Sequence, residues 1–368
     1  MSTPRFDIVI VGSGFAGAST AYHLSRRVSG SIAILEREKT PGEHASGRNA
    51  SLFRQSETDP AVRTAAVASR GAYARHAAEI GYEPVGSILL GGRETLEPAR
   101  VTGSPAGGGG GSRFVAPGRV TERIPLLGGH SIEAALETPG DGVIDTWALL
   151  TFYLAGARER GVELFTECPV LDVQRSGGSG PWRLETPRGS VEAGRLVNAA
   201  GGWAGELAER AGVPGPELVP YKRHLFVLDH PGPIDPAWPF VWDLDHGFYL
   251  RPESGGLLVS ICDEERSRSL EETVSPGIEE ALAERVHAHL PGLREAEIRR
   301  VWSCFRTRPA DGRFVIGPAA GDGARAEGFF WVAGLGGHGM GCSWEVGRLA
   351  AQGLLQGAGS GPFDPARF

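Results

Sequence analysis

A glycine-rich turn directly after a buried strand is the feature that most constrains how this chain can fold. Residues 6–11 (FDIVIV) form an apolar, β-branched run, which is typical of a parallel strand buried on both faces. The pattern Gly-x-Gly-x-x-Gly follows at residues 12–17, and residues 18–27 have the composition of a helix. A second apolar run, residues 31–35, ends at Glu36. This order predicts a dinucleotide-binding βαβ unit, in which the pyrophosphate lies at the helix N-terminus.

Each glycine of this turn has a separate task in such a unit. Gly12 permits the tight turn, Gly14 lets backbone N–H groups approach the pyrophosphate, and Gly17 lets helix and strand pack closely. Phe15 and Ala16 lie between them, where the helix N-terminus favours phosphate charge, so we count them as cofactor-binding positions too.

The acid after the second strand narrows the choice of cofactor. Glu36 lies roughly 20 residues beyond the turn, as the dinucleotide fingerprint requires, and Arg37 follows it. A carboxylate there accepts hydrogen bonds from the ribose hydroxyls and repels a 2′-phosphate, which disfavours NADP. The fingerprint alone does not separate FAD from NAD.

Composition excludes several classes of function. The formal net charge of −7 offers no basic field to a nucleic acid. Four cysteines and no CxxC pair give no sign of a disulfide scaffold or a zinc site, and we predict no metal. No apolar run reaches the eighteen or so residues of a membrane helix, and residues 1–7 lack a signal-peptide pattern. We expect a cytoplasmic protein, with peripheral attachment to a membrane left open.

Three further segments carry a resemblance to a known family. They are residues 43–50 (EHASGRNA), 196–204 (LVNAAGGWA) and 328–340 (GFFWVAGLGGHGM). With the glycine-rich turn, they make the chain resemble the D-amino-acid oxidase superfamily of FAD-dependent oxidoreductases. The branch that it resembles contains D-amino acid and D-arginine dehydrogenases, glycine oxidase and sarcosine oxidase. The resemblance implies FAD and a two-domain α/β (α+β) fold, with a Rossmann-like FAD-binding domain and an interleaved β-rich substrate domain.

The two domains are expected to alternate along the chain. The FAD-binding domain is predicted at residues 1–80, 140–210 and 310–368, and the substrate domain at residues 81–139 and 211–309. Residues 102–112 contain GSPAGGGGGS, which cannot bury apolar surface, and they are expected to form a flexible loop, natural or engineered.

The resemblance places the first two segments around the pyrophosphate and adenine parts of FAD. The residues expected beside the pyrophosphate and the flavin ring are Ser46, Gly47, Arg48 and Asn49. Those expected beside the adenine half are Ala200, Gly201 and Trp203. Val170, in a predicted strand over residues 170–174, resembles a family valine whose backbone hydrogen-bonds adenine. An ordinary core valine is the alternative.

The third segment is expected to line the flavin ring. Its residues Gly336, Gly337, His338, Gly339 and Met340 would lie beside flavin N1 and O2. Because these atoms gain negative charge on reduction, a helix N-terminus behind them stabilises the reduced cofactor.

The same resemblance names candidate substrate residues. Arg306 occupies the place of the family arginine that holds a substrate carboxylate bidentately, and Arg223 is a second candidate of this kind. Tyr249 would cover the substrate. His44 corresponds to a histidine near the substrate in D-arginine dehydrogenase-like relatives, and a structural role is the alternative.

Cys304 raises the question of covalent flavin. It has the register of the flavin-bonded cysteine of sarcosine oxidase-like enzymes, but residues 257–264 (LLVSICDE) lack the lysine of their oxygen-activating segment. A buried free cysteine and non-covalent FAD are therefore favoured. The missing lysine also favours a dehydrogenase over an oxidase.

The resulting prediction is an FAD-dependent amino acid dehydrogenase or oxidase. Hydride would pass from the α carbon of a small amine to flavin N5, giving an imine and then a 2-oxo acid. The partners are this substrate and an electron acceptor that is left open among oxygen, a quinone and an electron carrier. The alternatives are a 2-hydroxy acid or glycerol 3-phosphate dehydrogenase, and a flavin-binding subunit without its own turnover.

Overall fold

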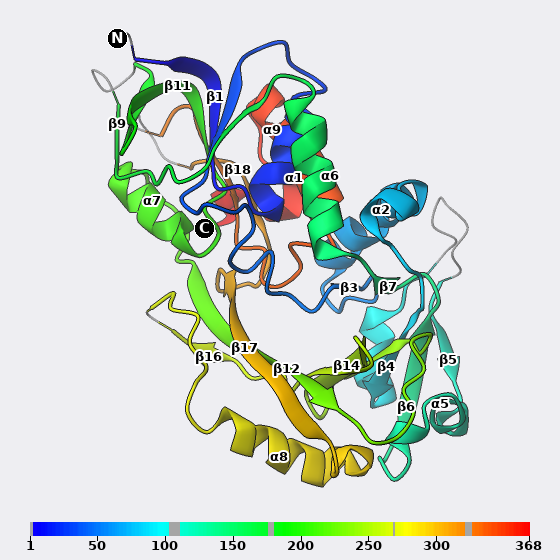
Figure 1. The fold of residues 1–368 in the computed structure, drawn as a ribbon. Coiled ribbons are helices and arrows are strands. Elements are labelled where there is room, and N and C mark those ends of the chain that lie inside the picture. Colours follow the sequence, from blue (N-terminus) through cyan, green and yellow to red (C-terminus); the bar gives the residue numbers. More distant parts are fainter. Residues whose placement is uncertain (1–2, 103–110, 176–179, 268, 321–325) are drawn as a thin grey trace. The chain divides into compact units, whose positions relative to one another are not determined.

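The computed structural model describes residues 3–102, 111–175, 180–267, 269–320 and 326–368 (Figure 1). The chain divides into two compact units: unit 1 comprises residues 1–47, 146–220 and 306–368, and unit 2 comprises residues 48–145 and 221–305. This mixed α/β arrangement confirms the predicted fold class. Of the predicted glycine-rich loop, residues 103–110 lie outside the described residues. Residues 48–80 and 140–145, assigned by sequence to the FAD-binding domain, lie in unit 2, whereas residues 211–220 and 306–309, assigned to the substrate domain, lie in unit 1.

Unit 1 is built on a largely parallel sheet. Its order is β18-β19-β11-β1-β2-β8, and β10 and β9 extend it beside β11. The pairs β1/β11, β1/β2, β2/β8 and β11/β19 are parallel, whereas β18, β10 and β9 run antiparallel to their neighbours. The strands are β1 (Arg5–Val11), β2 (Ile32–Leu35), β8 (Glu163–Phe165), β9 (Asp172–Arg175), β10 (Trp182–Thr186), β11 (Gly189–Asn198), β18 (Val315–Pro318) and β19 (Phe329–Ala333).

The register brings the carboxyl ends of the parallel strands to one edge. Val11 is paired with Leu35 on one side and with Asn198 on the other, and Asn198 is paired with Trp331. The glycine-rich turn follows the first of these ends and Glu36 follows the second. Ligands of open parallel sheets bind at this edge, so the fold itself positions a cofactor site there.

Three long helices pack together on the sheet of unit 1 (Figure 1). The helices and 3₁₀ turns of this unit are α1 (Phe15–Leu24), α6 (Thr146–Arg158), η4 (Gly201–Trp203), α7 (Ala204–Arg210), α9 (Ser343–Gln356), η6 (Gly361–Phe363) and η7 (Pro365–Arg367). Tyr22 of α1 packs against Tyr153 of α6 and Trp344 of α9, with ring centres 5.4 and 5.6 Å apart. These aromatic contacts pack the C-terminal end of α1 against α6 and α9.

Unit 2 contains a nine-stranded sheet with the order β16-β12-β15-β14-β13-β4-β6-β5, and β17 lies beside β12. Its pairs are antiparallel wherever a register is described, except that β13 and β4 run parallel. The strands are β4 (Ser87–Gly91), β5 (Arg113–Val115), β6 (Ala134–Thr138), β12 (Val219–Asp229), β13 (Phe240–Asp243), β14 (Phe248–Glu253), β15 (Gly256–Ser260), β16 (Glu265–Arg266) and β17 (Glu297–Arg308). A separate ribbon pairs β3 (Leu52–Phe53) with β7 (Gly142–Val143).

The sheet of unit 2 has two different faces. The helices and 3₁₀ turns of this unit are α2 (Pro60–Arg75), α3 (Ala77–Ile80), α4 (Arg93–Leu96), η1 (Glu97–Ala99), α5 (Pro117–Arg123), η2 (Pro125–Leu127), α8 (Ile278–His289) and η5 (Pro291–Leu293). Leu282 and Val286 of α8 cluster with Phe248 and Leu250 of β14. Tyr249, between those two strand residues, belongs to a different cluster, as the alternation of side chains along a strand requires.

Residues 60–80 form two helices rather than one. His76 (φ −106°, ψ 19°) leaves the helical conformation between α2 and α3. The Asp59 side chain caps α2, since it accepts hydrogen bonds from two backbone N–H groups of the first turn. Strand β17 was not predicted, because its first four residues are exposed and show no apolar alternation. Among the helices of the described residues, none is long and apolar enough to cross a membrane.

Candidate active site

The glycine-rich turn is shaped by close backbone packing. Gly12 has a φ of +101°, and a Cβ there would lie 2.5 Å from the carbonyl oxygen of Ala199. A Cβ on Gly17 would lie 1.9 Å from the carbonyl oxygen of Gly12. Both positions therefore require glycine, and the close approach places the start of α1 directly behind the strand ends. This is the cradle that a dinucleotide pyrophosphate needs.

Glu36 is fixed at the end of β2 by a residue that the sequence analysis missed. Its Oε2 accepts hydrogen bonds from the Ser13 backbone N–H at 2.8 Å and from the Ser13 hydroxyl at 2.6 Å. Its Oε1 accepts a hydrogen bond from the Glu38 N–H at 2.9 Å. A carboxylate has about four acceptor positions, so this buried group retains capacity for a ribose hydroxyl. In the sequence, the serine between Gly12 and Gly14 could have indicated a partner for this carboxylate.

Three candidates from separate segments meet beside this strand end. The guanidinium of Arg37 lies over the Trp203 ring at 4.3 Å, and the His44 ring lies 4.6 Å from that ring. Glu38 joins them, because its Oε1 lies 2.8 Å from Arg37 Nε and 2.9 Å from His44 Nε2. The hydrogen bond from His44, more than the charge of Arg37, lowers the pKa of Glu38. These contacts support the structural alternative for His44.

The predicted group at residues 46–49 is divided between the two units. The Ser46 hydroxyl accepts a hydrogen bond from the Phe15 N–H at 3.1 Å, which places it at the N-terminus of α1. The N–H of Gly47 closes a turn on the His44 carbonyl. Arg48 lies in unit 2, where its Nε is 2.6 Å from Glu272. Asn49, also in unit 2, accepts a hydrogen bond from a nearby backbone N–H through its side chain.

The segment after β11 is held by its own asparagine. Asn198 is fully buried, and its side chain donates to the Ala204 carbonyl at 2.7 Å and accepts from the Ala200 N–H at 3.3 Å. These bonds shape the turn that contains Gly201 (φ +57°). Val170 was predicted in a strand but lies in the loop before β9, and its carbonyl accepts a hydrogen bond from an arginine of α7 at 2.9 Å.

The C-terminal glycine loop of unit 1 lies against Arg306. The N–H of Gly336 donates to the Thr307 carbonyl at 3.1 Å, which ties the loop to the end of β17. Gly337 has a φ of +93°, and a Cβ there would lie 3.0 Å from Nε of Arg306 and 3.2 Å from its Cζ. The structure thus brings the proposed carboxylate-binding arginine onto the loop that was predicted to line the flavin.

The remaining residues of this loop complete the start of α9. The His338 N–H donates to the Leu335 carbonyl at 2.8 Å, and its ring lies 6.3 Å from that of Phe314. Met340 is buried, and its sulfur accepts a hydrogen bond from the Thr146 hydroxyl at 3.7 Å. A Cβ on Gly339 would meet only the Leu335 side chain, at 3.4 Å.

Unit 2 holds the substrate candidates Tyr249 and Arg223. The Tyr249 ring lies 4.5 Å from the Trp242 ring, and the tyrosine clusters with the buried Cys304. Arg223 already has two hydrogen-bond partners within unit 2. Its Nε donates to the Asp263 carbonyl at 2.7 Å, and its Nη2 donates to Glu264 at 3.0 Å. Its buried Nη1 has no hydrogen-bond partner among the described residues.

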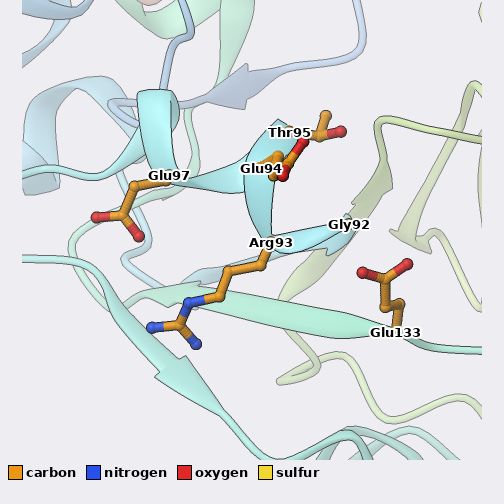
Figure 2. Close-up of a pocket in the computed structure, with 6 residues that line it drawn as sticks. All are labelled: Gly92, Arg93, Glu94, Thr95, Glu97 and Glu133. Atoms are coloured by element: carbon orange, nitrogen blue, oxygen red, sulfur yellow. The ribbon is translucent and has the colours of Figure 1, made fainter.

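A surface cavity of unit 2 contains no predicted site residue. It has a volume of about 640 Å³ and is lined by Gly92, Arg93, Glu94, Thr95, Glu97 and Glu133. Figure 2 shows the side chains of Arg93 and Glu97 on one side of it and Glu133 on the other. Because no large apolar residue lines it, this cavity does not have the character of a substrate pocket.

Comparison with known proteins shows which family this chain belongs to. The family model described as FAD dependent oxidoreductase (DAO) matches residues 7–353, so the chain belongs to this family. This confirms the resemblance drawn from the sequence. The buried glycine turn, Glu36 and the C-terminal glycine loop fit FAD as the cofactor.

Two relatives and one solved structure are named for the oxidation of an amine or an amino acid. The chain is 31% identical to mouse dimethylglycine dehydrogenase over 98% of its length, but it spans only 43% of that protein. It is 29% identical to glycine oxidase from Geobacillus kaustophilus, with 95% of this chain and 93% of the oxidase covered. Among solved structures, L-proline dehydrogenase from P. horikoshii superimposes with a TM-score of 0.86 at 22% identity, over 100% of this chain and 98% of that one. The last likeness shows the fold alone.

Proposed function

We propose that this protein oxidises the carbon–nitrogen bond of a small amino acid or of an N-substituted glycine. The observation that carries the proposal is the position of Arg306, whose guanidinium lies against Gly337 in the loop assigned to the flavin. A carboxylate bound by Arg306 would hold a short substrate beside the ring, whereas a long substrate would extend beyond it. The names of two relatives, dimethylglycine dehydrogenase and glycine oxidase, support small glycine-like substrates.

The proposed FAD site uses the residues of unit 1. The glycine-rich turn and Ser46 would hold the pyrophosphate, Glu36 the ribose, and the segment containing Trp203 the adenine half. Bound FAD would supply the two-electron acceptor for the reaction. Binding is proposed to be non-covalent, because the Cys304 thiol packs among Leu225, Leu258 and Tyr249.

The side chains are proposed to bind and orient the substrate. Arg306 would bind the carboxylate through two parallel N–H donors, an arrangement that a lysine cannot reproduce. Tyr249 would cover the substrate, and Arg223 would assist through its remaining Nη1 donor. The ammonium group must lose a proton before hydride leaves carbon, so turnover is expected to rise with pH. Water then hydrolyses the imine to a carbonyl compound and an amine.

The first test is anaerobic bleaching of the flavin spectrum. Purified protein is mixed with glycine, N,N-dimethylglycine, L-proline and both enantiomers of alanine, with lactate and glycerol 3-phosphate as comparison substrates. Bleaching by one of the amines supports the proposal. Bleaching only by lactate or glycerol 3-phosphate would assign the site to a hydroxy compound. Protein that holds FAD and reacts with none of them would fit a subunit without its own turnover. Reoxidation by air or by a dye then separates oxidase from dehydrogenase.

The role of Arg306 is tested by substitution. Arg306→Ala is expected to raise KM for the amine about 30-fold or more, since it removes a charge-assisted pair, and Arg306→Lys should recover part of this loss. Arg300→Ala is the matched control, because Arg300 is exposed on the same strand. A KM for Arg306→Ala equal to that of the control would remove Arg306 from carboxylate binding.

A further inference from the structure

A group of two histidines and one aspartate, of which His130 and Asp243 are buried, lies within unit 2, and no step of the proposed reaction uses it. Asp243 Oδ2 lies 2.8 Å from His130 Nε2 and 3.0 Å from His246 Nδ1. Taking one ligand atom from each residue, the three atoms lie within 4.8 Å of one another. The side chains of His130 and Asp243 are each 2% exposed. His246 is 36% exposed, which leaves one side of the group open to solvent.

The fold fixes the carboxylate so that one oxygen faces the histidines. Asp243 is the last residue of β13, and its Oδ1 accepts hydrogen bonds from the N–H groups of Asp245 at 3.0 Å and His246 at 2.7 Å. These bonds orient Oδ2 towards both imidazoles. An outer set of hydrogen bonds that aims a ligand in this way is typical of metal sites.

A third imidazole lies beside this group. The ring centre of His289, at the end of α8, is 4.2 Å from that of His246 and 6.2 Å from that of His130. The His130 ring is itself held edge-on against Phe248 at 5.5 Å. Three histidines and one carboxylate thus converge from a loop, a turn and a helix end.

We propose that His130, Asp243 and His246 form a binding site for a divalent transition metal ion of the zinc class, with His289 or water in the fourth position. Zinc takes imidazole nitrogen and carboxylate oxygen at about 2.0–2.1 Å in tetrahedral geometry, which sets neighbouring ligand atoms roughly 3.3 Å apart. The nitrogen–oxygen separations of 2.8 and 3.0 Å need to open slightly, and the two imidazole nitrogens, which lie within 4.8 Å of each other, need to reach the same spacing. Imidazole-rich sites disfavour magnesium and calcium, which prefer oxygen ligands.

The position of the site indicates a structural task. Along β14, Phe248 faces the cluster packed under α8, and Tyr249 faces the opposite side of the sheet. The ion would therefore lie on the face away from the proposed substrate tyrosine. It would join the loop after η2, the turn between β13 and β14, and the end of α8. The sequence predicted no metal, because only Asp243 and His246 lie close together, three residues apart, whereas His130 precedes Asp243 by 113 residues.

The test is zinc binding by the purified holoenzyme after tag removal and treatment with a chelator. Zinc is titrated against a chromophoric competitor, and metal content is measured by mass spectrometry after dialysis. We expect one zinc ion per chain and a rise in Tm on the order of 5 °C at a hundredfold excess over Kd, with no such rise for magnesium. Cobalt should give a tetrahedral absorption band at wavelengths beyond the flavin spectrum.

Variants assign the ligands. His246→Gln and His130→Gln should each weaken zinc binding at least tenfold, whereas His287→Gln should leave it unchanged, because His287 is exposed on the same helix as His289. If His130→Gln fails to fold, His246→Gln alone tests the proposal, because the His246 side chain is the more exposed of the two. The proposal is overturned if zinc does not bind stoichiometrically, or if it binds His246→Gln as tightly as the unaltered protein. Asp243 would then be a carboxylate held by the histidines alone.

Discussion

The two glycine-rich segments of unit 1 have similar compositions but need glycine for different reasons. At residues 12–17 the obstacle to a side chain is the backbone itself, since Cβ atoms on Gly12 and Gly17 would lie 2.5 and 1.9 Å from carbonyl oxygens. At residues 334–339 the neighbour of Gly337 is the side chain of Arg306, and the backbone conformation has a φ of +93°. The first segment is thus constrained by packing of main chain on main chain, and at Gly12 also by a positive φ. The second is constrained by conformation and by a residue assigned to substrate binding.

This difference predicts different consequences for the same substitution. A methyl group in the first segment should disturb helix packing and FAD retention together. At Gly337, in the second segment, it should change substrate binding while FAD remains bound. Glycine-to-alanine variants therefore separate the scaffold from the site.

The largest effect is expected for Gly17→Ala. Its Cβ cannot be accommodated without moving α1 away from the turn, so we expect a loss of stability of about 3 kcal/mol. Thermal denaturation and the ratio of flavin to protein absorbance measure the result. Gly205→Ala in α7 is the control, because a Cβ there meets no atom within 4 Å and should be neutral or stabilising by up to about 1 kcal/mol. A Gly17→Ala protein as stable as this control would refute the packing account.

An intermediate effect is expected for Gly337→Ala. The left-handed conformation costs an L residue about 1–2 kcal/mol, and the new methyl group pushes on the Arg306 guanidinium. We expect a Tm lower by a few degrees and a KM for the amine raised about tenfold, with FAD retained. Steady-state kinetics beside the flavin spectrum provide the check. If FAD is lost and KM is unchanged, Gly337 belongs with the first class of glycines.

The smallest effect is expected for Gly339→Ala. Its Cβ would make ordinary contacts with the Leu335 side chain at 3.4 and 3.7 Å, and its φ is not positive. We expect stability within about 0.5 kcal/mol of the unaltered protein and an unchanged KM. Loss of FAD in this variant would show that the cofactor approaches Gly339 closely, because the neighbouring protein atoms leave room for the methyl group.

Local patterns predicted the cofactor half of the fold well. Strand β1, helix α1 and strand β2 lie within three residues of their predicted limits, because a buried run, a turn and a helix follow one another within 35 residues. The parallel pairing of β13 with β4 could not be predicted in the same way, since Phe240 meets Ser87 across a long separation in sequence. Pairings of this kind depend on the packing of the whole unit.

The candidate site was predicted unevenly for a related reason. The glycine positions and Glu36 follow from the fingerprint, but the hydrogen bonds from Ser13 that orient Glu36 do not. Arg223 was predicted as a second candidate for binding the substrate carboxylate, and its pairing with Glu264 has no signal near Arg223 in the sequence. Residue types can be assigned from motifs, whereas the partners of each charge are set by tertiary contacts.

The sheet of unit 1 has a consequence for how the chain is made. β1 ends at Val11, and β2 can cover one of its edges early, but β11 on the other edge begins only at Gly189 and β19 beyond it at Phe329. During translation, one edge of this apolar strand therefore stays unpaired until about half of the 368 residues have been synthesised. Open edges pair readily with other chains, and long-range pairing slows folding. The nascent polypeptide thus carries an aggregation hazard at the very strand that will later support the cofactor.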